Sequence, residues 1–150
     1  MSSNEPPAQA EPQWFEAIVE QTPDAIIFAD CDGLIRVWNR GAEAVFGFSA
    51  AEVVGRSLDV IVPERFRAAH WAGFRQAVEC GRTQHGGQVR TTRSMHKLGG
   101  TLYVDLSFGL VRNEAGSVIG SVAVGRDCSA RYLSEKALRE RLSRLEKPSS

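Results

Sequence analysis

A histidine in an apolar setting is the first residue of this sequence whose type and spacing could do chemistry. In the segment PERFRAAHWAGF, Phe66, His70 and Phe74 follow one another at intervals of four residues. Residues spaced in this way lie on one face of a helix, so the imidazole of His70 would be in line with an apolar stripe. Such an imidazole is either an ordinary half-buried histidine or a group that binds a metal or a ligand.

No arrangement of reactive residues indicates catalysis, so we expect a protein that is not an enzyme. The sequence has no Ser-His-Asp pattern, nucleophile elbow, phosphate-binding loop or HExxH zinc motif. The three cysteines are far apart and form neither a CxxC zinc knuckle nor a CxxCH haem-attachment motif. They are typical of reduced thiols in a cytoplasmic protein.

The composition is that of one globular domain. Hydrophobic residues make up 43% and charged residues 24% of 150 residues, and the formal net charge is zero. Without an acidic or basic block, nothing indicates a nucleic-acid or membrane partner. The N-terminal segment MSSNEPPAQAEPQ lacks the features of a signal peptide, and no apolar run could span a bilayer, so we expect a cytoplasmic location.

The hydrophobic periodicity predicts an α+β fold. The elements expected in order are a helix over 14–21, strands over 25–29 and 34–38, short helices capped by Asn39 and Ser49, a longer helix from Pro63 to about Cys80, three strands between 88 and 124, and a C-terminal helix starting at Asp127. This order indicates a five-stranded antiparallel sheet with helices gathered on one side and further helices at both ends. A cavity for a small ligand is expected between the sheet and the longer helix.

The C-terminal helix carries a short leucine seam. Leu138, Leu142 and Leu145 are spaced four and three residues apart, as in a coiled coil. The seam either joins two copies of the chain or covers the sheet, and we favour a homodimer. At the start of the helix, Asp127 is expected to act as the cap and to pair with Arg131.

Four stretches resemble the PAS sensor family, and they lie within residues 23–131. They are PDAIIFADCDGLIRVWNRGAEAVFGFSAAEVVG, IVPERFRAAHWAGF, HKLGGTLYVDLSFG and GSVAVGRDCSAR. The resemblance implies a disordered tail over 1–12, a PAS sensor domain over 13–127, and a C-terminal signalling helix and tail over 128–150. PAS domains bind haem, flavin, small acids or nothing, so the fold alone does not select the ligand.

The longer helix is most similar to that of the haem-binding, oxygen-sensing PAS domains of the FixL type. This resemblance implies that His70 is the proximal ligand of the iron of haem b. It also implies that Arg90, twenty residues later, hydrogen-bonds the bound oxygen. The other residues expected in the haem pocket are Leu106 and Phe108 on the distal side, together with Phe66, Phe74 and His85.

We therefore expect a sensor module that binds haem b and senses a diatomic gas, with oxygen first, or a redox state. The signal would pass through Asp127 and the C-terminal helix to an unidentified partner protein. One alternative is a cofactor-free PAS module for dimerisation and protein contact, with His70 an ordinary histidine, His85 a surface histidine and Arg90 a solvated residue at the edge of the sheet. A second alternative is a pocket for flavin or another small ligand, although the Asn-Cys-Arg motif of the light-sensing flavin class is absent.

Overall fold

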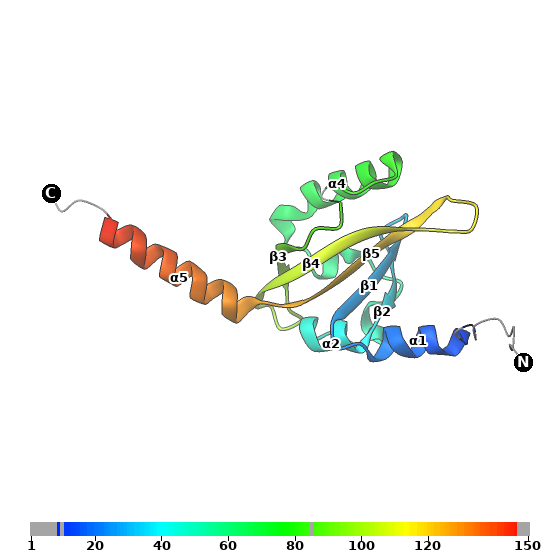
Figure 1. The fold of residues 1–150 in the computed structure, drawn as a ribbon, viewed down its shortest axis with the longest axis horizontal. Coiled ribbons are helices and arrows are strands. Elements are labelled where there is room, and N and C mark those ends of the chain that lie inside the picture. Colours follow the sequence, from blue (N-terminus) through cyan, green and yellow to red (C-terminus); the bar gives the residue numbers. More distant parts are fainter. Residues whose placement is uncertain (1–8, 10, 85, 147–150) are drawn as a thin grey trace, which may run out of the picture.

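A single antiparallel sheet organises the part of the chain that the computed structural model describes, residues 9, 11–84 and 86–146. The strand order in the sheet is β2-β1-β5-β4-β3 (Figure 1). The elements are α1 (Pro12–Gln21), β1 (Ala25–Asp30), β2 (Ile35–Trp38), α2 (Arg40–Phe46), α3 (Ala50–Val53), the 3₁₀ turns η1 (Leu58–Val60) and η2 (Glu64–Phe66), α4 (Arg67–Cys80), β3 (Arg90–Met95), β4 (Thr101–Arg112), β5 (Val118–Asp127) and α5 (Ser129–Glu146). The predicted α+β class and the predicted order of elements are confirmed.

The short helices begin and end where local side chains dictate. Asn39 accepts a hydrogen bond from the amide of Ala42 as the N-cap of α2, and Gly47 ends that helix with a φ of 83°. The predicted cap Ser49 forms a capping box with Glu52 at the start of α3. The longer helix differs from the prediction, because a 3₁₀ turn follows Pro63 and regular α-helix starts only at Arg67.

Asn39 does more than cap a helix, because its buried side chain ties three elements together. Its Oδ1 also accepts from the amide of Ile26 in β1, at 2.8 Å. Its Nδ2 donates to the carbonyls of Val19, Thr22 and Asp24, at 2.8, 3.2 and 2.9 Å. Every polar atom of this side chain therefore has a partner, as a buried amide requires. The segment that leads from α1 into β1 is held on the sheet by these bonds.

The core lies between the sheet and the short helices, and α4 contributes only partly buried side chains, those of Trp71 and Phe74, to its edge. The buried apolar residues come from β1, β2, β4, α2, α3 and the η1 region, and they are Ala25, Ile27, Ala29, Ile35, Trp38, Ala42, Phe46, Val53, Leu58, Ile61, Val104 and Leu106. None of the fourteen residues of α4 is fully buried. This helix therefore covers the sheet without packing tightly against it.

The two terminal helices lie at opposite ends of the molecule, and α5 projects away from the sheet (Figure 1). No residue of α1 or α5 is fully buried. Among the residues that the structure describes, no helix combines the length and apolar character that crossing a membrane requires.

Candidate functional site

A cavity separates α4 from the inner face of the sheet. It consists of two adjoining hollows of about 480 and 280 Å³, a size in the range of small-molecule sites. The residues that line both hollows come from α4 and from β3, β4 and β5, and they are Ala69, His70, Phe74, Arg90, Thr92, Phe108 and Ser121. The predicted cavity between the longer helix and the sheet is therefore present.

The helix that forms one wall of the cavity is attached near its ends. Near the N-terminal end, Trp71 Nε1 donates to Asp59 Oδ1 at 2.7 Å, and Arg67 Nε donates to the carbonyl of Val62 at 3.1 Å. At the C-terminal end, the guanidinium of Arg112 donates to the carbonyl of Gly81. The middle of α4 spans the cavity between these attachments.

Small residues on α4 make room for the cavity, and the sequence analysis missed most of them. Ala69, Gly73 and Ala77 recur at intervals of four residues and line the smaller hollow. Their spacing is a signal that could have been used, because it places a row of small side chains along one helix face. Trp71 lies outside this lining and packs against the turn at Gly33, where an added Cβ would come within 2.2 Å of the indole ring.

His70 places a neutral, partly unsatisfied imidazole on the cavity wall. Its ring lies edge-on to Trp71, with the centroids 4.7 Å apart, and its centroid is 6.3 Å from that of Phe74. The Nδ1 atom is buried and has no hydrogen-bond partner among the described residues. Burial lowers the pKa of His70, and the charge of Asp59 opposes this only in part. The neutral ring, the form that can coordinate a metal, is therefore favoured.

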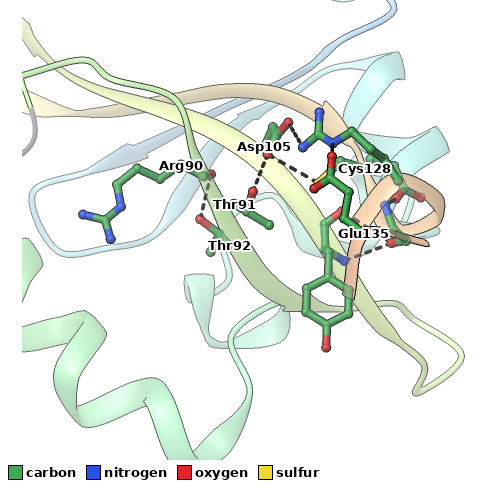
Figure 2. A network of polar contacts seen from close by, with 10 residues as sticks. Arg90, Thr91, Thr92, Asp105, Cys128 and Glu135 are labelled. Atoms are coloured by element: carbon green, nitrogen blue, oxygen red, sulfur yellow. Dashed lines mark hydrogen bonds and ion pairs between the residues drawn. The ribbon is translucent and has the colours of Figure 1, made fainter. Parts of the chain in front are cut away.

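The opposing wall is supplied by β3 and β4. Arg90 pairs with Leu106 in the antiparallel register of these strands, and both residues line the larger hollow. Leu106 is buried, whereas Phe108 is 39% exposed and lines the cavity without closing it. The side chain of Arg90 points away from the neighbouring Asp105, and Thr92 Oγ1 donates to the carbonyl of Arg90 at 3.4 Å (Figure 2).

The structure thus gathers most of the predicted pocket residues around one cavity. His70, Arg90, Leu106 and Phe108 line it, as do Phe66 and Phe74. The predicted pocket residue His85 lies outside the described residues. The roles of all these residues toward a ligand stay predictions.

The start of α5 differs from the prediction. Asp127 Oδ1 accepts from the amide of Ser129 at 2.7 Å, which is a local cap of the helix start. The predicted pairing of Asp127 with Arg131 is wrong, because Arg131 bonds to Asp105 at 2.6 Å and lies 3.8 Å from Glu135. The side chain of Asp105 is only 17% exposed, so water competes less with the guanidinium of Arg131 for this carboxylate.

The leucine seam lies on the free part of α5. Leu138, Leu142 and Leu145 are 57%, 50% and 77% exposed, so they do not cover the sheet in this structure. The alternative in which the seam joins two copies is untested.

The family model of the PAS fold matches residues 14–128. The chain belongs to the PAS family. Proteins of this family are generally sensory modules, and they commonly relay signals to partner domains and dimerise. The chain is 35% identical to the sensor protein FixL of Bradyrhizobium diazoefficiens over 54 residues, which is 36% of this chain and 11% of FixL. It is 24% identical to the oxygen sensor protein DosP of Escherichia coli over 127 residues, covering 85% of this chain and 16% of DosP.

Solved structures share the fold at lower identity. The PAS domain of a protein from Colwellia psychrerythraea has a TM-score of 0.68 at 21% identity, over 79% of this chain and 97% of that domain. An RNA-binding light-oxygen-voltage receptor has a TM-score of 0.71 at 22% identity, over 93% of this chain and 41% of the receptor. The chain spans only 11–17% of the length of the curated relatives that it matches.

Proposed function

We propose that this PAS domain is a sensor module whose cavity binds haem b through His70. The observation that carries the proposal is the buried Nδ1 of His70, which has no hydrogen-bond partner among the described residues. A buried polar atom without a partner costs free energy and calls for an explanation. An imidazole kept neutral by burial, on the wall of an apolar cavity, is suited to bind iron.

The donor set fits haem. No group of three or more His, Cys, Asp and Glu side chains that could hold a bare metal ion occurs among residues 9, 11–84 and 86–146. Haem iron needs only one protein ligand, which His70 would supply, and the bound haem would supply a binding site for a diatomic gas. The name of one relative, the oxygen sensor protein DosP, supports a gas as the sensed ligand.

The remaining residues of the cavity would shape its chemistry. Leu106, Phe74 and Phe108 supply apolar surface to the walls of the cavity. Arg90 supplies a permanent cation, and a charge-assisted hydrogen bond from it would favour a ligand that carries partial negative charge. This hydrogen bond would form only when the cavity holds a ligand, so the position of the Arg90 side chain would depend on whether a ligand is bound.

The output is proposed to pass through α5 to a partner protein. The exposed leucines of that helix are suited to a homodimer, and Asp127 lies at the junction from which α5 starts. A cytoplasmic location remains part of this proposal, as does a role without catalysis of its own.

Absorption spectroscopy tests the proposal directly. The purified protein is titrated with haem, reduced with dithionite and exposed to CO, and we expect a sharp Soret band that shifts at each step. His70→Ala should lose this band, whereas His96→Ala should keep it. His96 is a suitable control because its Nδ1 accepts from the amide of Leu98 in a turn and the residue does not line the cavity.

Each other outcome of the spectra has a definite meaning. A protein that stays colourless after the titration would contradict haem binding and support the cofactor-free alternative. A yellow preparation that releases flavin on denaturation would support the flavin alternative. A Soret band that is identical in wild type and His70→Ala would refute the assignment of His70 while leaving haem in place.

A further inference from the structure

The first turn of α5 is docked on one short stretch of β4. The amide of Cys128 donates to the carbonyl of Tyr103 at 2.8 Å, and the amide of Tyr103 donates to Ser129 Oγ at 3.0 Å. The rings of Tyr103 and Tyr132 stack with centroids 3.8 Å apart. Beyond these contacts the helix projects away from the domain (Figure 1). The direction of α5 is therefore set by what holds its first turn.

Asp105 is the centre of the polar contacts at this junction (Figure 2). Its Oδ1 accepts from Thr91 Oγ1 at 2.7 Å and from Cys128 Sγ at 3.4 Å, and its Oδ2 accepts from Arg131 Nη2 at 2.6 Å. The hydrogen bond from Thr91 and then that from Arg131 lower the pKa of Asp105, so the carboxylate is ionised at neutral pH. One carboxylate thus joins β3, β4 and α5.

The same two strands also form the cavity wall. Arg90 is paired with Leu106, and the next pair in the register is Thr91 with Asp105. Successive side chains of a strand point to opposite faces, so Leu106 faces the cavity while Asp105 reaches the first turn of α5. On β4 a single peptide unit separates the cavity residue Leu106 from the junction residue Asp105, and on β3 Thr91 both lines the larger hollow and bonds to Asp105.

We infer that Asp105 is the positioning residue that fixes α5 on the sheet and passes a change in the cavity on to this helix. A ligand that contacts Arg90 would shift β3 against β4, lengthen the hydrogen bond from Thr91 to Asp105, and weaken the hold of Asp105 on Arg131. The part of the inference that involves a ligand rests on the proposed function, whereas the docking role of Asp105 does not.

Arg131 has a second partner on its own helix besides Asp105. Its Nε lies 3.8 Å from Glu135, one turn along the same helix. If the first turn of α5 leaves the sheet, Arg131 loses its ion pair with Asp105 but keeps its contact with Glu135 on the same helix. A released state of α5 would lose the bonds to Asp105 together with the contacts of Tyr103, and two such states form the kind of element that a ligand can bias.

Hydrogen exchange of the cofactor-free protein tests the docking role. Asp105→Asn keeps the shape of the side chain but removes its charge, and we expect amides of 128–136 to exchange about fivefold faster, near the upper limit for a partly exposed ion pair. The matched control is Asp30→Asn, which removes the 2.7 Å ion pair of Asp30 with Arg36 on the same sheet. The control should leave 128–136 unchanged, and peptides of β1 and β5 report whether each variant stays folded.

Equal exchange of 128–136 in Asp105→Asn and in wild type would overturn the docking role. The relay is tested by adding haem to wild type and to Thr91→Val, which keeps the shape of the side chain and loses the hydroxyl. We expect haem to change the exchange of 128–136 in wild type, and this response to disappear in Thr91→Val although its Soret band is retained. A full response in Thr91→Val would overturn the relay. A protein that never binds haem would overturn the proposed function, and the cofactor-free comparison would then decide the role of Asp105 alone.

Discussion

The unpaired nitrogen of His70 predicts that this proposed ligand-binding residue destabilises the cofactor-free protein. In His70→Leu, an apolar side chain of similar size replaces a ring whose Nδ1 is buried without a partner among the described residues. An unsatisfied buried polar atom costs about 1–3 kcal/mol, and because the ring is only partly buried we expect a gain of about 1 kcal/mol. Urea unfolding has a slope of about 2 kcal/mol/M for a small protein, so the midpoint should rise by about 0.5 M.

The pH dependence gives this prediction a second, independent signature. Burial holds the pKa of His70 below its ordinary value of 6.5 in the folded protein. As the pH falls through 6.5, the unfolded chain therefore takes up a proton on this residue that the folded chain does not. Stability is lost over the window from 6.5 down to the lowered pKa, and it is retained above 6.5. His70→Leu lacks this loss, so its advantage over wild type should grow as the pH decreases.

The assay is urea unfolding of the cofactor-free proteins, followed by far-ultraviolet circular dichroism at pH 8 and at pH 5.5. The control is Phe74→Leu, on the same helix face, which removes ring contacts without removing a polar atom and should lower the stability. Adding haem should reverse the order, because a ligand that binds only the folded state stabilises wild type. A His70→Leu protein that is less stable than wild type at both pH values would refute the reasoning.

Three other changes have definite expected outcomes. Asn39→Ala should lower the free energy of unfolding by at least about 3 kcal/mol in urea titrations, because several buried backbone groups lose their partner at once. Gly41→Ala should also destabilise, by about 1–3 kcal/mol in the same assay, since its Cβ would come within 2.1 Å of a backbone carbonyl. Trp71→Phe should lose about 1 kcal/mol with the bond to Asp59, and its haem should dissociate faster in a transfer assay, because α4 is then less firmly attached. A faster dissociation in Phe15→Leu, on a distant helix, would show that the effect of Trp71→Phe is not specific.

The sequence by itself determined the elements of the fold and their order, because the signals that set them are local. The caps at Asn39 and Ser49 depend only on a few neighbouring residues, and so does the positive φ that Gly47 adopts at the end of α2. The alternation in β4 depends on the two-residue period of a strand. The resemblance to PAS proteins was also visible in the residues, and it located His70 and Arg90 before any geometry was known.

Only the tertiary structure decided how these residues meet. The unsatisfied nitrogen of His70 depends on how far α4 stands from the sheet, and no local rule sets that distance. The sequence predicts Asp127 as the partner of Arg131, but the register of β4 with β5 and the direction of α5 bring Arg131 to Asp105. Helices and strands follow from short-range periodicity, whereas a cavity and an ion pair across 26 residues depend on how separate elements pack.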